Sequence, residues 1–270
     1  MSVVMTIPEY QVQRVAQDWR VGARASAYYD RAEKEDWLVV FWERKTKFRQ
    51  LFDRLNTQTL VELACGHGRH TARIFDNHQI FTKIERMYLM DVNNENITFC
   101  KERFKNNKSI IPLVNNGYNF QPLDDESVTA IFCYDAMVHF EYDAVVSYID
   151  DASRILIPGG RALLHHSNYD KSPGADYSSN PGWRNFMSKN LFAHVAIRDG
   201  FKIVEQLVID CDDYRTLDCI SLIEKREERD QITSIPYKRS RLSGRVLHKL
   251  VLRQIRNRLS LNRLFADSGG

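Results

Sequence analysis

The sequence predicts an α/β fold, a doubly wound parallel sheet covered by helices, and three observations support this. An apolar run ends in a glycine turn, Leu60 to Gly68, and apolar strands alternate with helical segments after it. The last two strands, residues 202–209 and 217–224, are joined by a short polar connection. A parallel crossover needs roughly a dozen residues or more, so these two strands should form an antiparallel hairpin.

The composition is that of a soluble globular protein, with 270 residues, 43% hydrophobic and 27% charged. The N-terminus shows no basic segment followed by an apolar run, and no stretch approaches the ~18 apolar residues of a spanning helix. Neither secretion nor membrane spanning is therefore expected. The five cysteines form no Cys-x-x-Cys pair, so we expect buried free thiols, Cys65 and Cys133 among them, and a reducing cytoplasm.

Three parts are expected along the chain: an N-terminal helical lid over residues 1–55, a central domain over 56–230 and a basic tail over 231–270. Residues 11–55 contain no proline and have apolar residues at helical spacing, which predicts two or three helices. This segment is rich in aromatic residues. Its rings either pack on the following domain or cover a ligand site, with Tyr28 and Tyr29 the first candidates for the lid.

The strands are expected at residues 60–65, 86–92, 109–115, 130–135 and 161–166, followed by the hairpin. Helices are expected from Arg69, over 93–104, over 142–154 and over 183–198. Pro158-Gly159-Gly160 is interpreted as a tight turn between a helix and the fifth strand. Residues 168–181 are rich in Ser, Asp, Pro and Gly and are expected to form a long loop.

The glycine turn and an acidic residue at the end of the second strand form a pattern typical of nucleoside binding. The backbone approaches the ligand closely at Gly66 and Gly68, and Asp91 can accept hydrogen bonds from ribose hydroxyls. A dinucleotide motif would have a third glycine where this chain has Thr71. Glu62 suits a ligand that carries positive charge, because a nearby carboxylate attracts a sulfonium or ammonium group.

The sequence resembles the class I S-adenosylmethionine-dependent methyltransferases from Leu60 to about Lys225. The motif Glu-Leu-Ala-Cys-Gly-His-Gly at 62–68 is similar to the acidic and glycine pattern of that family, with Ala64 in place of its first glycine. Leu-Met-Asp-Val-Asn at 89–93, Phe-Cys-Tyr-Asp-Ala-Met-Val-His at 132–139 and Ile-Leu-Ile-Pro-Gly-Gly at 155–160 are similar to its other motifs. The resemblance implies a Rossmann-like seven-stranded sheet of order 3-2-1-4-5-7-6 with the last strand antiparallel.

The resemblance also implies that S-adenosylmethionine (SAM) is the cofactor. Its methionine part would lie at the turn, its ribose at Asp91 and its adenine at Asn116 and Gly117. His67 is a further candidate, for the cofactor carboxylate; it is otherwise exposed at the turn. His70 is expected on the surface of the following helix, and Arg69 and Arg73 are expected to be solvated. The complete set expected to bind the cofactor is Glu62, Ala64, Gly66, His67, Gly68, Asp91, Val92, Asn116, Gly117 and Tyr134.

The acceptor should lie where the fourth and fifth strands end, because the ligand crevice of such a sheet is at the carboxyl ends of its strands. Those ends carry Asp135, His139, His165 and His166. His139 is the first candidate for a general base, since its ordinary pKa is near neutrality; it is otherwise a structural histidine. Asp135 and His165 complete the catalytic set. His165 and His166 are adjacent on a strand, so at most one faces the ligand. A metal site built from Asp135, His139 and one of this pair is the alternative, but no recognisable ligand spacing supports it and no metal is expected.

The tail differs in charge from the rest of the chain. Residues 231–270 hold nine Lys and Arg against one acid, a net charge of +8, whereas the whole chain carries +3, which leaves −5 for residues 1–230. Residues 238–264 combine these charges with apolar residues at helical spacing. Such a helix would dock on its own or a partner chain or lie on an anionic membrane surface. Nucleic acid is not expected as a partner, because the tail has few aromatic residues.

The expected activity is methylation of an oxygen of a sugar or glycan by a cytoplasmic enzyme, peripheral to the inner membrane face. The segments 134–141 and 165–169 are similar to methyltransferases that accompany bacterial polysaccharide assembly. Three alternatives stay open: an N-methyltransferase acting on a small amine, a nicotinamide-dependent oxidoreductase, and a catalytically silent interaction module. The missing third glycine and the closing hairpin argue against the oxidoreductase.

Overall fold

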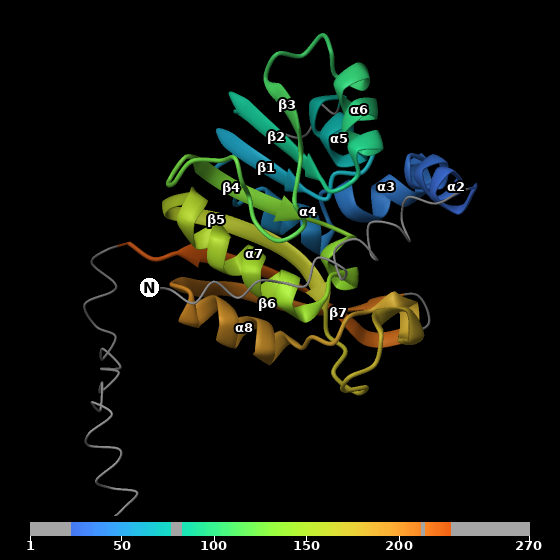
Figure 1. Ribbon diagram of the computed structural model, residues 1–270, viewed down its shortest axis with the longest axis vertical. Coiled ribbons are helices and arrows are strands. Elements are labelled where there is room, and N and C mark those ends of the chain that lie inside the picture. Colours follow the sequence, from blue (N-terminus) through green and yellow to red (C-terminus); the bar gives the residue numbers. More distant parts are fainter. Residues whose placement is uncertain (1–22, 77–82, 212–213, 228–270) are drawn as a thin grey trace, which may run out of the picture. The chain divides into compact units, whose positions relative to one another are not determined.

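The computed structural model describes residues 23–76, 83–211 and 214–227, which contain a seven-stranded sheet of order β3-β2-β1-β4-β5-β7-β6 (Figure 1). The strands β1 to β5 are parallel to one another, and β7 is antiparallel to both β5 and β6. The predicted fold, strand order and hairpin are therefore confirmed. The bounds are β1 Thr59–Leu63, β2 Arg86–Asp91, β3 Ile110–Val114, β4 Val128–Cys133, β5 Leu156–Ser167, β6 Phe201–Cys211 and β7 Tyr214–Lys225.

Helices cover both faces of the sheet. One hydrophobic core lies between the sheet and the helices α7 and α8, and a second lies between the sheet and the helices α3 to α6. The bounds are α2 Ala23–Ala32, α3 Glu35–Trp42, α4 Lys47–Phe52, α5 Arg69–Asp76, α6 Asn94–Arg103, α7 Tyr142–Ile155 and α8 Lys189–Arg198. Short 3-10 turns are η1 Met137–His139, η2 Tyr177–Ser179 and η3 Pro181–Trp183.

The apolar run in β1 shows why the sheet needs helices on both faces. Successive side chains of a strand point to opposite faces, so Leu60 packs in the core beneath α3 to α6 while Val61 and Leu63 pack beneath α7 and α8. Burial of each such side chain stabilises the fold by roughly 1.5–3 kcal/mol. This places the end of β1, and the glycine turn after it, rigidly at the carboxyl edge of the sheet.

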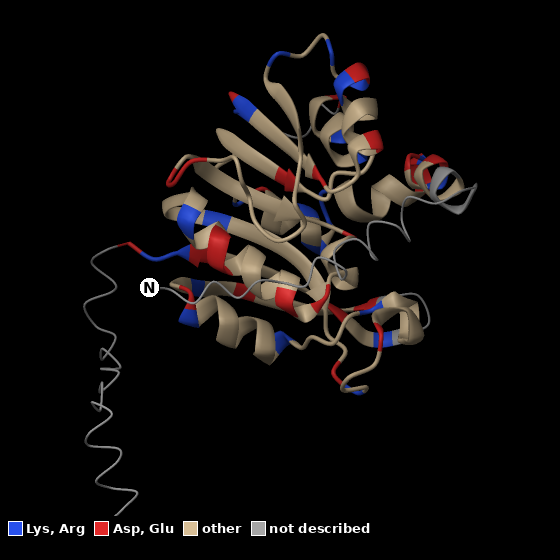
Figure 2. Cartoon of the chain, in the orientation of Figure 1, with Lys and Arg blue, Asp and Glu red and all other residues tan. Residues whose placement is uncertain are grey.

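The N-terminal helices are tied to the domain by ion pairs as well as by packing. Arg73 of α5 bonds Glu35 at 2.6 Å, and Arg103 of α6 bonds Glu33, which follows α2, at 2.6 Å. Basic and acidic residues are interspersed along the described part of the chain (Figure 2). Within residues 23–55 the structure describes the helices α2 to α4. The rest of the segment in which two or three helices are expected, residues 11–22, lies outside the described residues.

Two element boundaries differ most from the prediction. The helix expected over 183–198 begins only at Lys189, because Gly182 and Trp183 have left-handed φ values of 56° and 57° and the Ser188 hydroxyl caps the helix. Strand β5 begins at Leu156, directly after α7, so 158–160 lie inside the strand and form no separate turn. A shift of register opposite Val128 and Ala130 accommodates these extra residues.

The predicted basic helix of the tail lies outside the described residues. Among the residues that the structure does describe, the helices are too short or too polar to cross a membrane.

Candidate active site

The turn after β1 is built from residues in the left-handed conformation. Ala64, Gly66 and Gly68 have φ values of 57°, 53° and 73°, a region that glycine adopts without the steric cost that a Cβ brings. A Cβ at Gly68 would lie 2.6 Å from the Phe104 ring, so that glycine is also needed for close packing against the end of α6. In the methyltransferase pattern that the sequence resembles, glycine stands at the position of Ala64. The left-handed φ of this residue is the conformation that favours glycine.

Asp91, at the end of β2, holds the turn from beneath. One carboxylate oxygen accepts the Gly66 N–H at 2.9 Å, and the other accepts the Asn93 N–H at 2.8 Å and the Asn96 amide at 3.1 Å. Burial raises the pKa of Asp91, and these three hydrogen bonds oppose that rise. The carboxylate thus both fixes the turn and lines the cavity beside it.

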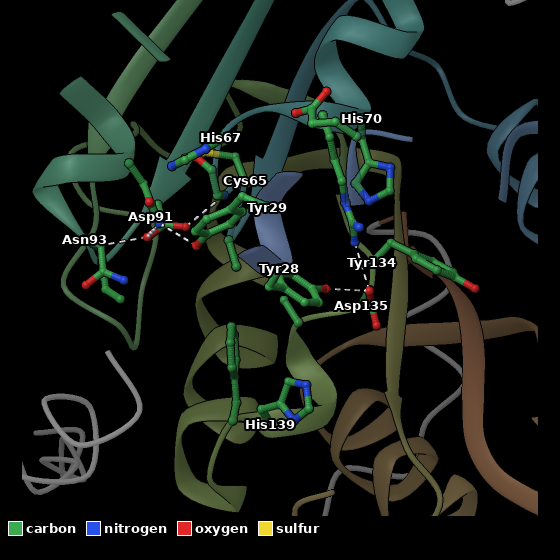
Figure 3. A pocket seen from close by; sticks show the side chains of 18 residues that line it. Tyr28, Tyr29, Cys65, His67, His70, Asp91, Asn93, Tyr134, Asp135 and His139 are labelled. Atoms are coloured by element: carbon green, nitrogen blue, oxygen red, sulfur yellow. Dashed lines mark hydrogen bonds and ion pairs between the residues drawn. The ribbon is translucent and has the colours of Figure 1, made fainter. Parts of the chain in front are cut away.

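Two tyrosines of α2 reach into this cavity (Figure 3). The Tyr29 ring stacks on His67 with 4.0 Å between ring centroids, and its hydroxyl accepts the Asn96 amide at 3.0 Å. A Cβ at Gly66 would approach Tyr29 Cε1 to 2.8 Å, so the ring lies directly against the turn. The Tyr28 hydroxyl donates to Asp135 at 2.9 Å. Burial raises the pKa of both tyrosine hydroxyls, so both are neutral.

Asp135 and Arg69 form a charged pair on the other side of Tyr28. Asp135 follows β4 with a left-handed φ of 58°, and its carboxylate accepts Arg69 Nη2 at 2.9 Å. Such a conformation in a residue other than glycine is often found at functional sites. Burial raises the pKa of Asp135, but the Arg69 charge and other nearby groups outweigh it and lower the pKa in net. The carboxylate is therefore ionised at neutral pH.

Sequence reasoning missed Arg69, which was expected to be solvated. It is only 9% exposed, and its Nη1 is buried without a hydrogen-bond partner among the described residues. Its position as the first residue of α5, directly after the glycine turn, was the available signal. A buried guanidinium N–H with no partner costs free energy, so this position suits an anionic group.

His139 lines the same cavity from η1 and is buried. Its Nδ1 lies 2.6 Å from the Trp183 carbonyl oxygen. Because a carbonyl can only accept, the proton of the neutral ring is on Nδ1, and Nε2 is the basic nitrogen. Burial lowers the pKa of His139 to about 4, despite that hydrogen bond, which raises it. The ring is therefore neutral throughout the physiological range.

The predicted site residues fall into two groups. The cavity, of about 100 Å³, is lined by Ala64, Gly66, His67, Asp91, Val92, Tyr134, Asp135 and His139. The residues of the predicted set that do not line it in the described structure are Glu62, Gly68, Asn116, Gly117 and His165. Among the described residues, no group of three or more His, Cys, Asp or Glu side chains is arranged to hold a metal ion.

Glu62 and Asn116 are engaged elsewhere. Glu62 is buried beneath the turn, where it accepts the Thr71 hydroxyl. Asn116 is exposed, and its side-chain oxygen accepts the N–H groups of Tyr118 and Asn119 within its own loop. Assignment of the adenine to Asn116 and Gly117 stays a prediction.

The histidines next to one another in β5 lie on opposite faces, as expected. His166 is fully buried and stacks on Phe192 of α8 at 3.9 Å between ring centroids. His165 lies behind Asp135, whose backbone N–H donates to its Nδ1 at 3.1 Å. His70, expected on a helix surface, is instead buried and accepts the Trp42 indole N–H at 3.0 Å.

Comparison with known proteins agrees with this geometry. Residues 61–164 match the family model described as a methyltransferase domain. No curated protein matches the chain. A putative methyltransferase crystallised with the Trm112 activator of Haloferax volcanii has a TM-score of 0.54 at 17% identity, over 82% of this chain and 100% of that one.

Two further solved structures share the fold. A SAM-dependent methyltransferase from Mesorhizobium loti has a TM-score of 0.52 at 14% identity, over 66% of this chain and 97% of that one. Geranyl diphosphate methyltransferase in complex with SAM also has a TM-score of 0.52, at 13% identity, over 66% and 83%. The matched domain, in a sheet of this topology, makes the chain a SAM-dependent methyltransferase with SAM as its cofactor.

Proposed function

We propose that this methyltransferase methylates a hydroxyl oxygen of a small polar acceptor, a sugar or glycan. The observation that supports the proposal is that one cavity joins the glycine turn and Asp91 to Asp135 and His139. The first pair suits the nucleoside of the cofactor, and the second offers a hydrogen-bond acceptor and a base. Tyr28, Arg69 and Asp135 make the acceptor side polar, which suits a hydroxylated molecule.

The residues beside the cavity fit the cofactor. SAM carries a carboxylate, which the buried, unpartnered Nη1 of Arg69 can bind. Each carboxylate oxygen takes two hydrogen bonds, so the Asp91 oxygen that accepts only the Gly66 N–H can also accept one ribose hydroxyl. Bound SAM supplies an electrophilic methyl group on a sulfonium. The residues that would hold it are Ala64, Gly66, His67, Asp91, Val92 and Tyr134, with Arg69 added from the structure.

His139 is the base in this proposal. A hydroxyl acceptor must lose its proton as the new bond to carbon forms, and Nε2 of the neutral imidazole can accept it. Nδ1–H stays bonded to the Trp183 carbonyl and keeps the ring oriented. Asp135 remains ionised and accepts a hydrogen bond from a second hydroxyl of the acceptor, which turns the reacting hydroxyl toward His139.

Helix α2 acts as a lid over the site in this proposal. A cavity of about 100 Å³ is smaller than the roughly 300–1,000 Å³ of pockets for ligands of this size. Tyr28 and Tyr29 occupy part of the space, because the Tyr28 hydroxyl bonds Asp135 and the Tyr29 ring lies against the glycine turn. Cofactor entry therefore requires α2 to move outward.

A screen for methyl incorporation tests the acceptor class. Nucleotide sugars, glycan fragments and small amines are incubated with the enzyme and SAM labelled in its methyl group. We expect label on a sugar oxygen, and we expect His139→Gln to slow it by roughly 10²-fold or more, the usual contribution of a general base. Label on an amine, with little effect of His139→Gln, would contradict the proposal.

The tail and the location of the enzyme are a separate part of the proposal. We expect residues 238–264 to attach a cytoplasmic enzyme to the anionic inner face of a membrane where glycans are assembled, because basic and apolar residues alternate there at helical spacing. Co-sedimentation with anionic vesicles should capture the full chain and not a chain that ends at Asp230. Equal failure of both chains to bind would remove this part.

A further inference from the structure

A buried ion pair lies behind the acceptor side of the cavity. Arg184 donates to both carboxylate oxygens of Asp218 at 2.7 Å, and the two residues are 5% and 1% exposed. Asp218 comes from β7, and Arg184 directly follows η3. Burial raises the pKa of Asp218, but the hydrogen bonds and positive charge of Arg184, together with the neighbouring His165, outweigh it and hold the pKa well below its usual value.

The pair reaches Asp135 through His165. The Nε2 atom of His165 lies 3.1 Å from the Asp218 carboxylate, and its Nδ1 accepts the backbone N–H of Asp135 at 3.1 Å. An Nδ1 that accepts carries no proton, so the proton of the neutral ring is on Nε2, which lies close to the Asp218 carboxylate without meeting hydrogen-bond geometry. The ring is also stacked on Tyr134, with 4.5 Å between centroids. His165 thereby holds the backbone of Asp135 in its left-handed conformation.

The same pair reaches His139 through the chain next to Arg184. The carbonyl oxygen of Trp183, the residue before Arg184, accepts the hydrogen bond from Nδ1–H of His139. Asn185, the residue after it, donates its backbone N–H to the Val138 carbonyl at 2.8 Å and its side-chain amide to the Phe140 carbonyl. The segment 183–185 is thus attached to η1 on both sides of His139. The guanidinium of Arg184, through its two hydrogen bonds to Asp218 of β7, fixes that segment to the sheet.

We propose that Arg184 and Asp218 are positioning residues that set the geometry of Asp135 through His165 and the tautomer of His139 through the Trp183 carbonyl. This inference rests on the proposed function, in which Asp135 and His139 serve the acceptor. A buried ion pair adds little net stability, because the loss of hydration offsets the attraction between the charges. What the pair provides instead is a specific arrangement of four segments distant in sequence, at residues 135–140, 165, 183–185 and 218.

The tautomers of the two histidines provide the first test, because they need neither an acceptor nor a variant. Long-range ¹H–¹⁵N correlation spectra of the full-length protein labelled in histidine distinguish a proton on Nδ1 from one on Nε2. We expect His139 to carry its proton on Nδ1 and His165 on Nε2. A proton on Nε2 of His139, or on Nδ1 of His165, would overturn the inference.

Substitution of Arg184 provides the second test. Arg184→Met removes the guanidinium and its two hydrogen bonds to Asp218, so we expect His139 to exchange between its two tautomers. Arg184→Lys keeps the positive charge and should retain part of the signal of the wild-type His139 tautomer. Arg198→Met is the matched control, because Arg198 forms an ion pair with Asp199 on the surface. This substitution should leave the tautomer signals of His139 and His165 unchanged. Unchanged tautomers in a folded Arg184→Met protein would also overturn the inference.

Calorimetry with SAM on the same samples separates this inference from the proposed function. We expect Arg184→Met to bind SAM within about threefold of wild type, because the glycine turn and Asp91 are built from other elements. Once an acceptor is known, its turnover should fall by roughly 10- to 100-fold, the scale of a small misplacement of a reacting group. Absence of SAM binding by the wild type would count against the proposed function alone, because the tautomers are measured without ligand.

Discussion

The buried carboxyl of Glu62 allows a quantitative prediction about the turn. Burial raises its pKa from 4.5 to about 7, although the Thr71 hydroxyl and the Arg69 charge lower it. Between these two pH values the folded protein keeps a proton that the unfolded chain has released, so stability falls as the pH rises through that window. At about 1.36 kcal/mol per pKa unit, the loss amounts to roughly 3 kcal/mol.

The perturbation is Glu62→Gln, which keeps an oxygen for the Thr71 hydroxyl and removes the titration. Urea unfolding followed by tryptophan fluorescence at pH 5 and at pH 8 gives the free energy of unfolding of both proteins. All other titrating groups are shared, so the difference between variant and wild type isolates Glu62. Relative to wild type, we expect the variant to gain roughly 2–3 kcal/mol between pH 5 and pH 8.

Glu85→Gln is the matched control, because Glu85 is exposed and its substitution should give the same difference at both pH values. If Glu62→Gln also gave the same difference at pH 5 and pH 8, the carboxyl would not be buried beneath the turn as described. A variant that lost stability on going from pH 5 to pH 8 would have the wrong sign and would refute the reasoning.

Three further predictions concern the turn, the base and the lid. Ala64→Gly should raise the free energy of unfolding by about 0.5–1 kcal/mol in thermal unfolding. The removed steric cost of a Cβ at left-handed φ exceeds the conformational entropy that glycine adds to the unfolded chain. The control Ala72→Gly, within α5, should lower the free energy of unfolding by about 1 kcal/mol. His139 should titrate near pH 4 by NMR, so its contribution to stability is present above pH 6.5 and is lost as the pH falls toward 4; a midpoint near 6.5 would contradict its burial. Tyr29→Ala should speed association of SAM several-fold in stopped-flow fluorescence, because its ring closes the turn; an unchanged rate would argue against the lid.

Local signals predicted the fold. The glycines at 66 and 68 mark a turn that few other residues can form, and the short connection at 210–216 forces an antiparallel hairpin. The start of α8 was placed too early, because the aromatic Trp183 continues the helical pattern while its φ of 57° does not allow a helix. That φ is imposed by tertiary contacts of the segment 183–185 with η1, which no local pattern contains.

The candidate site was predicted where it depends on strand ends and missed where it depends on long-range pairing. Asp91, Asp135 and His139 line one cavity because the carboxyl ends of neighbouring parallel strands meet at one edge. Arg69 was expected to be solvated, because its partner Asp135 is 66 residues away in the chain. His70 was expected on a surface, because the burial of that face of α5 by Trp42 of α3 cannot be read from the helix itself.

The central claim, that SAM lies against the glycine turn with its ribose at Asp91, is tested most directly by a cycle of protein and ligand changes. Calorimetry would compare S-adenosylhomocysteine with its 2′-deoxy analogue on wild type and on Asp91→Ala. A hydrogen bond to a charged group contributes about 1.5–3 kcal/mol, so we expect the wild type to prefer the hydroxylated ligand by roughly 10- to 100-fold. The variant should bind weakly and without preference. An unchanged preference in Asp91→Ala would place the ribose elsewhere and contradict the account.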